Sequence, residues 1–141
     1  WTMNYDKILT ALEKRVLDLQ GVPAIAWENV KYTPTTGTPY IQTRFMPIDR
    51  RSPFIGLDSD GKHFNQRYVG IFQLNLYYPE SRGQKPTNTI VNEICDKFDA
   101  GTDLSHDGVY VTISQTERMR GINESPWFIT PVNVHWYSYA K

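Results

Sequence analysis

The longest regular pattern in this chain is an alternation of apolar and polar residues within residues 68–76. Every second position from Tyr68 to Leu76 is apolar or glycine, and Gln73 and Asn75 stand at positions between them. Side chains of a β-strand point alternately to opposite faces, so the pattern predicts a strand with one apolar and one polar face. Such a strand folds only within a sheet whose apolar face is covered by another layer.

Four further stretches show the same alternation, and two show the period of a helix. The further strands are predicted at residues 24–30, 40–46, 109–114 and 128–136. Helices are predicted over residues 5–19 and 87–98, because their apolar residues recur on one helical face. The element order, α-β-β-β-α-β-β, predicts an α+β fold. We expect a two-layer sandwich in which both helices pack on one face of a mostly antiparallel, five-stranded mixed sheet.

The length of 141 residues fits one domain that spans residues 1–141. Hydrophobic residues make up 40% of the chain, which suffices for a core and excludes a disordered tail. Residues 47–67 interrupt the alternation with prolines, glycines and charged residues, and we predict a long loop there. A loop of about twenty residues in a compact domain is commonly functional. We therefore take its cations as interface candidates, namely Arg50, Arg51, Lys62 and Arg67.

Acidic and basic residues are balanced, since 15 Lys and Arg stand against 15 Asp and Glu. Proteins that coat nucleic acid or an anionic membrane usually carry a basic excess, so neither partner is predicted. The zero net charge also favours self-association. Cys95, the only cysteine, excludes an intrachain disulfide, and its place on an apolar helix face predicts an inert thiol. Without a recognisable signal peptide or membrane-spanning stretch, we expect synthesis in the cytoplasm.

No motif in the chain predicts an enzyme, a cofactor or a metal centre. Residues 56–62 fit the spacing of a phosphate-binding loop, but His63 stands where that loop needs Ser or Thr. Asp58 and Asp60 would also repel a phosphate. As a calcium loop, the same segment lacks both terminal ligands, which leaves open only a weak incidental cation site. We therefore predict no catalytic, cofactor-binding or metal-ligating residue.

Aromatic residues are abundant, with four Trp, nine Tyr and six Phe. Many fall on or beside the predicted strands, and a core of this size can absorb about half of them. The remainder are of the type enriched at protein interfaces, so Tyr110, Trp127 and Trp136 join the interface candidates. Ordinary strand propensity explains the same abundance equally well, and both interpretations remain open at this point.

Four segments of the chain carry a resemblance to a known family. Residues 25–34 read IAWENVKYTP and are followed by Gly37 and a Pro-Tyr-Ile run. Residues 70–79 read GIFQLNLYYP, residues 98–104 read FDAGTDL, and Trp-Phe with a Pro-Val-Asn-Val run closes the last strand. In this order, these segments resemble the motifs of phage tail terminator-like proteins over about residues 1–137. The segment 50–66 departs from the family by being longer and more charged.

The resemblance implies a virion structural protein made in the host cytoplasm. Such a subunit forms a hexameric ring on the end of a long non-contractile tail tube, stops tube polymerisation and offers the head-joining surface. Its implied partners are further copies of itself, the tail tube protein and a head–tail connector or neck protein, with the genome passing through the ring lumen. Membrane, cofactor, catalytic residues and sequence-specific nucleic acid play no part. Alternatives are another neck or tail-completion protein of the same fold, a small-molecule-binding α+β domain and, least favoured, an enzyme.

Overall fold

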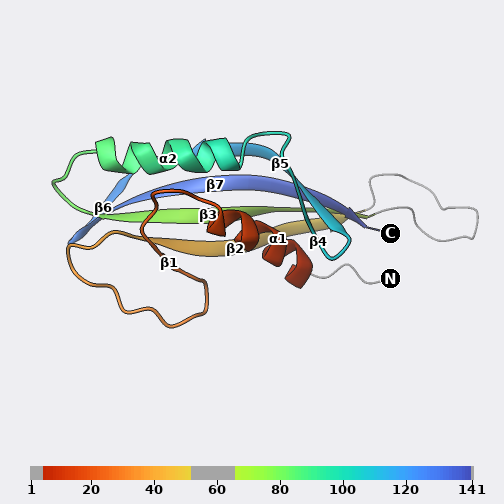
Figure 1. Ribbon diagram of the computed structural model, residues 1–141, viewed down its shortest axis with the longest axis horizontal. Coiled ribbons are helices and arrows are strands. Elements are labelled where there is room, and N and C mark those ends of the chain that lie inside the picture. Colours follow the sequence, from red (N-terminus) through yellow and green to blue (C-terminus); the bar gives the residue numbers. More distant parts are fainter. Residues whose placement is uncertain (1–4, 52–65, 141) are drawn as a thin grey trace, which may run out of the picture.

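The computed structural model describes residues 5–51 and 66–140, which form two helices and a seven-stranded mixed sheet (Figure 1). In chain order the elements are α1 (Tyr5–Leu17), β1 (Ala24–Ala26), β2 (Tyr40–Arg51), β3 (Gln66–Pro79), α2 (Lys85–Lys97), β4 (Asp103–His106), β5 (Val109–Arg118), β6 (Ile122–Glu124) and β7 (Trp127–Ala140). No helix in this part of the chain is long and apolar enough to cross a membrane.

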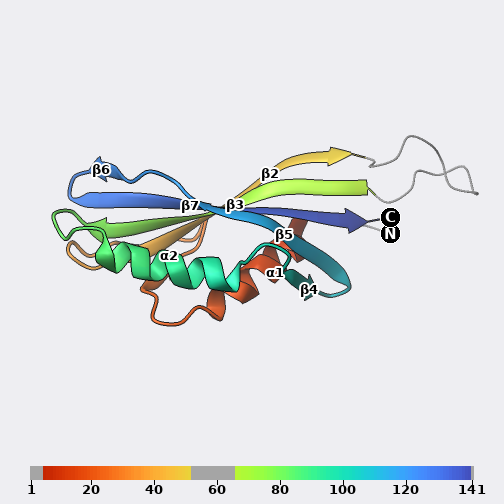
Figure 2. The same cartoon turned by 90° about the horizontal axis from the view of Figure 1, so that it is seen from above.

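The strands lie in the order β1-β2-β3-β7-β5-β4, and β6 pairs with the beginning of β7. Only β1 and β2 run parallel, and the other pairs are antiparallel. The sheet forms a half-barrel, so the α+β class is confirmed, whereas the five strands and the plain two-layer sandwich are not. Both helices lie along the same side of the sheet (Figure 2).

One hydrophobic core joins the helices to the sheet. Its members come from the apolar positions of both helices and from alternate positions of the long strands. They include Ile8, Leu12 and Val16 of α1, Ile90 and Ile94 of α2, Phe72, Leu74 and Leu76 of β3, and Val132, Val134 and Trp136 of β7. The predicted alternation in residues 68–76 therefore identifies the buried face of the central strand, as expected from the two-residue period.

Two strands were missed by the sequence analysis. β4 precedes a two-residue turn at Asp107 and Gly108, where both φ angles are positive, at 50° and 82°. An Asp-Gly pair favours such a hairpin turn, so the signal was present in the sequence. β6 is a three-residue strand whose residues are all exposed, and its sequence has no alternation.

Several predicted boundaries are corrected by the structure. β2 continues to Arg51 and β3 begins at Gln66, so the ends of the predicted loop 47–67 are strand. The rest of that loop, with Lys62, lies outside the described residues. The first strand ends at Ala26 because a turn follows, in which the Val30 N–H donates to the Trp27 carbonyl.

Candidate functional site

The sheet face opposite the core carries the polar positions of the alternation. We call this surface the open face and define it by seven polar side chains from four neighbouring strands. They are Arg44 of β2, Gln73 and Asn75 of β3, Gln115 and Glu117 of β5, and Asn133 and His135 of β7. Figure 2 shows both described helices on one side of the sheet and neither on the other.

Strand register brings one row of these side chains together. Arg44 lies opposite Gln73, Gln73 lies opposite Asn133, and Asn133 lies opposite Glu117. Side chains directly opposite on neighbouring strands are close enough to interact. The row therefore runs across four strands and links parts of the chain that are far apart in the sequence.

A β-bulge places the β5 residues on this face. The register of β5 against β7 shifts between Ile113 and Gln115. Ile113 lies opposite the buried Trp136, whereas Gln115 lies opposite His135 on the open face. A bulge inserts one extra residue, so the odd-numbered residues after it change face. For this reason the predicted strand ended at residue 114, although β5 continues to Arg118.

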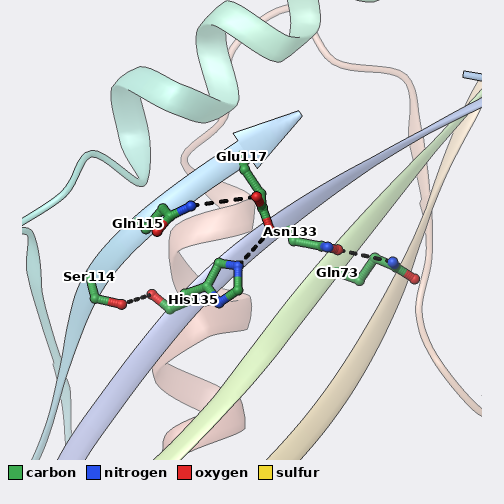
Figure 3. Close-up of polar contacts among 6 residues, drawn as sticks. All are labelled: Gln73, Ser114, Gln115, Glu117, Asn133 and His135. Carbon is green, nitrogen blue, oxygen red and sulfur yellow. Dashed lines mark hydrogen bonds and ion pairs between the residues drawn. The ribbon is translucent and has the colours of Figure 1, made fainter. Parts of the chain in front are cut away.

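Three amide side chains form one hydrogen-bonded group on the open face, and Figure 3 shows the contact between Gln73 and Asn133. The Gln73 Nε2 donates to the Asn133 Oδ1 over 3.0 Å, and the Asn75 Nδ2 donates to the Gln73 Oε1 over 3.1 Å. Asn75 is buried despite its polarity. A buried amide group without a hydrogen-bond partner destabilises the folded chain, so breaking these bonds is unfavourable. They therefore hold the side chains in a fixed arrangement.

A second group is centred on Glu117 (Figure 3). The Nε2 of His135 lies 2.8 Å from the Glu117 Oε1, and the contact is an ion pair when the imidazole is protonated. The Gln115 Nε2 donates to the other carboxylate oxygen over 3.5 Å. The Ser114 hydroxyl donates to the His135 carbonyl over 3.2 Å, at the bulge itself. The open face is thus an ordered polar surface.

An aromatic cluster lies at the end of the sheet where β2 begins. Tyr40 and Tyr77 stack with their ring centroids 4.4 Å apart and their planes 10° apart. Trp127 meets both rings edge-on, at 5.3 Å from Tyr40 and 6.2 Å from Tyr77. Burial raises the pKa of both tyrosines, so their hydroxyl groups stay neutral. This packing gives Trp127 a structural role while leaving it half-buried.

A hollow of about 420 Å³ adjoins this cluster along β1 and β2. Much of the IAWENVKYTP segment lines it, including Trp27, Glu28, Asn29 and Tyr32, and Arg44 of β2 lines it as well. The Glu28 carboxylate accepts a hydrogen bond from the Phe45 backbone N–H over 2.7 Å. The segment that carries the family resemblance therefore forms one structural unit beside the edge of the sheet.

The arginine candidates lie at the opposite end of the long strands. Arg50 and Arg51 belong to β2 and lie opposite Tyr68 and Arg67 of β3. The Arg67 guanidinium is half-buried and lies 5.5 Å from the centre of the Tyr137 ring, a cation–π arrangement. The register of β2 against β3 therefore places Arg51 opposite Arg67, at the ends of the two strands.

The aromatic candidates fall into different environments. Tyr110 is 66% exposed on β5 and is available for contacts. Trp136 is 0% exposed, which corrects its assignment to an interface. Its ring covers Gly70 on the core side, where a Cβ atom would lie 2.4 Å from the ring. Trp136 is therefore a core residue of the folded chain.

Cys95 is half-buried, and burial raises the pKa of its thiol, with the nearby carboxylates of Asp96 and Asp99 acting in the same direction. A thiol with a raised pKa is a poor nucleophile. Within residues 5–51 and 66–140, no group of three His, Cys, Asp or Glu residues is placed to hold a metal ion.

Comparison with known proteins agrees with this geometry. A family model described as "Phage tail terminator protein" matches residues 7–136. No curated protein sequence matches the chain. One solved structure has a TM-score of 0.75 at 23% sequence identity, with 99% of this chain and 98% of that chain covered. At this identity, the likeness shows a shared fold alone.

Proposed function

The chain belongs to the phage tail terminator family, a structural family, and we propose that it forms a homo-hexameric ring on the end of the tail tube. In this role the ring stops tube polymerisation and presents the surface that joins the tail to the head. Its partners are other copies of the chain, the tail tube protein and a head–tail connector or neck protein. Membership of the family supports a tail component of the virion.

The structural observation that carries the ring proposal is the difference between the two edges of the sheet. One edge is formed by β1 and β2 and the other by β4 and β5. A contact between unlike surfaces is heterologous, and repeated contacts of this kind close into a ring when the rotation allows. We propose that the exposed Tyr110 and the arginines of the β2–β3 end contribute to such contacts.

Light scattering across a size-exclusion peak tests the ring directly. Six copies of a 16.4 kDa chain give about 98 kDa, and negative stain should show a central hole. A monomer at every concentration would contradict a ring that forms by itself. Loss of the protein from the phage should then be examined, because overlong tubes indicate a terminator. Normal-length tails without heads would instead indicate the neck or tail-completion alternative.

The alternative of a small-molecule-binding domain would use the hollow beside the aromatic cluster, which is the site that we propose to test. Its lining includes the charged groups of Glu28 and Arg44. Stoichiometric binding of a hydrophobic dye to a monomeric chain would favour that alternative. Absence of dye binding, together with a hexameric mass, would remove it.

A further inference from the structure

Within residues 5–51 and 66–140, the strand that pairs with the outer edge of β2 is β1, and it covers that edge only in part. β1 pairs with β2 over Tyr40–Gln42, although β2 extends to Arg51. A strand edge with free N–H and carbonyl groups is a template on which another chain can pair. The segment after Gln42 contains Phe45, Met46 and Ile48, and Ile48 is 64% exposed. Such apolar residues on an edge strand favour aggregation.

Glu28 occupies this edge in the folded chain. The Phe45 backbone N–H donates to the Glu28 Oε1 over 2.7 Å, so that donor is already used by a side chain of the same molecule. The Glu28 backbone N–H donates to the Thr43 Oγ1 over 3.1 Å. Glu28 is therefore fixed to β2 through its main chain and through its carboxylate. A hydrogen bond to a carboxylate is stronger than one between neutral groups.

The turn after β1 places Glu28 at this point. Asn29 adopts a left-handed conformation with φ of 59°, which asparagine tolerates better than most residues. The Val30 N–H donates to the Trp27 carbonyl over 3.1 Å and closes the turn around Glu28. Three successive residues thus have three different roles. Trp27 packs against the core, Glu28 contacts the edge of β2, and Asn29 forms the turn.

Pro47 removes the next donor along the same edge. Alternate residues of an antiparallel strand direct their N–H groups to the same side, so the position after Phe45 on the outer edge is Pro47. Proline has no N–H. The β2–β3 register then shifts between Pro47 and Asp49, which interrupts the edge further. Two successive outward positions therefore offer no donor to another strand.

We propose that Glu28 prevents a second copy of this chain from adding a strand to the outer edge of β2. The carboxylate occupies the Phe45 N–H, and Pro47 and the bulge protect the edge beyond it. A ring whose contacts use side chains of this edge is compatible with the proposal, because the proposal excludes only main-chain pairing of a second copy with β2. A wild-type chain that fails to form rings would leave this proposal untouched.

The test compares Glu28→Ala with Glu28→Gln in the full chain, with Glu124→Ala on the exposed β6 as a matched control. Hydrogen exchange at the Phe45 amide and light scattering against concentration are measured for each. Removal of the acceptor in Glu28→Ala should speed exchange at Phe45 about tenfold or more and produce assemblies larger than those of the wild type. Glu28→Gln keeps a carbonyl oxygen and should resemble the wild type, as should Glu124→Ala.

Equal exchange and equal assembly size in Glu28→Ala and wild type would overturn the proposal. It would also be overturned if Glu28→Gln assembled as strongly as Glu28→Ala, because charge alone would then be responsible. Circular dichroism shows whether each variant is folded. If Glu28→Ala is unfolded, Thr43→Val decides, since it removes only the hydroxyl that holds the Glu28 main chain. Faster Phe45 exchange in Thr43→Val supports the proposal, and unchanged exchange overturns it.

Discussion

Gly70 illustrates how a single position is determined by a contact far away in the sequence. It occupies a core-facing position of β3 and lies opposite Trp136 of β7 and Pro47 of β2. A Cβ atom here would lie 2.4 Å from the Trp136 ring and 2.8 Å from the Met46 carbonyl oxygen. The backbone contact cannot be relieved by a side-chain rotation alone. The indole ring therefore fills the space that a side chain at position 70 would need.

We expect Gly70→Ala to destabilise the chain by about 1–3 kcal/mol, because the added methyl group overpacks the contact with Trp136. Thermal or urea unfolding measures the change. Gly37→Ala is the comparison, since a Cβ there meets nothing within 4 Å and only its φ of 88° opposes alanine. If Gly70→Ala and the wild type have the same free energy of unfolding, the inferred contact between Trp136 and position 70 is wrong.

Such residue-level constraints were only partly predictable. The alternation in residues 68–76 predicted which side chains of β3 are buried, because the two-residue period is local. The same reasoning could not decide whether Trp136 faces a core or a partner. That depends on the pairing of β7 with β3, which is a long-range contact. The predicted interface role of Trp136 failed for this reason.

Asp107 links the β4–β5 hairpin, in whose turn it lies, to helix α1. Its carboxylate lies 3.0 Å from the Lys7 Nζ of α1. The hydrogen bond from Lys7, followed by its positive charge, lowers the pKa of Asp107 below the ordinary 3.8. A lowered pKa means that the ion pair stabilises the fold above about pH 3.8, and this contribution is lost as the pH falls through the folded-state pKa.

We therefore expect the melting temperature of Asp107→Asn to be slightly lower than that of the wild type at neutral pH. In strong acid we expect the two melting temperatures to be equal. Asparagine tolerates the positive φ at this position, so the turn itself is kept. Melting temperatures of both proteins over a pH series measure the difference. A difference that is constant over the whole series would contradict the ion pair as its cause.

At the scale of elements, the sequence predicted what depends on local periodicity and missed what depends on the register between strands. Both helices and the central strands were predicted because their periodicity is carried within each segment. β5 was cut short because its bulge reverses the alternation, and a single-strand pattern cannot distinguish a bulge from a loop. The open face was missed as a site for the same reason, since Glu117 and His135 meet only after the bulge is formed.

Arg118 joins the end of β5 to the beginning of α2. Its Nε donates to the Asn88 Oδ1 over 3.1 Å, and its Nη2 donates to the Gln84 Oε1 over 2.7 Å. Gln84 is the N-cap of α2 and makes no side-chain capping bond to the helix. The guanidinium therefore anchors a helix end that has no cap of the usual kind.

We expect Arg118→Lys to lower the free energy of unfolding by about 1 kcal/mol, because an ammonium group cannot reproduce the two-pronged geometry. Hydrogen exchange in the first turn of α2 should rise more than in its last turn. Arg120→Lys, on the neighbouring loop, provides the matched control. If hydrogen exchange in Arg118→Lys rises equally in the first and last turns of α2, or no more than in Arg120→Lys, then Arg118 does not anchor this end of the helix.

At the scale of the whole molecule, we infer from the strand register that the sheet forms independently of the residues that connect β2 to β3. Arg51 and Arg67 are paired across the two strands, so the ends of the connection are already side by side. Antiparallel neighbours need only two to five residues to be joined. The sequence between them is therefore longer than the sheet requires. We propose that it reaches a neighbouring subunit, the tube end or the lumen.

Deletion of residues 53–63 is the test of that hypothesis. The deletion leaves Ser52, Phe64 and Asn65 between the two strands, a length compatible with a hairpin. We expect the shortened chain to keep the circular dichroism spectrum and the melting temperature of the wild type to within a few degrees, because the paired strands remain. In the phage, we expect tails of abnormal length or tails that fail to join heads, as measured by electron microscopy. Tails of normal length with heads attached would show that the segment makes no contact that assembly needs. A shortened chain that unfolds would instead show that residues 53–63 stabilise the sheet, contrary to the separation inferred from the strand register.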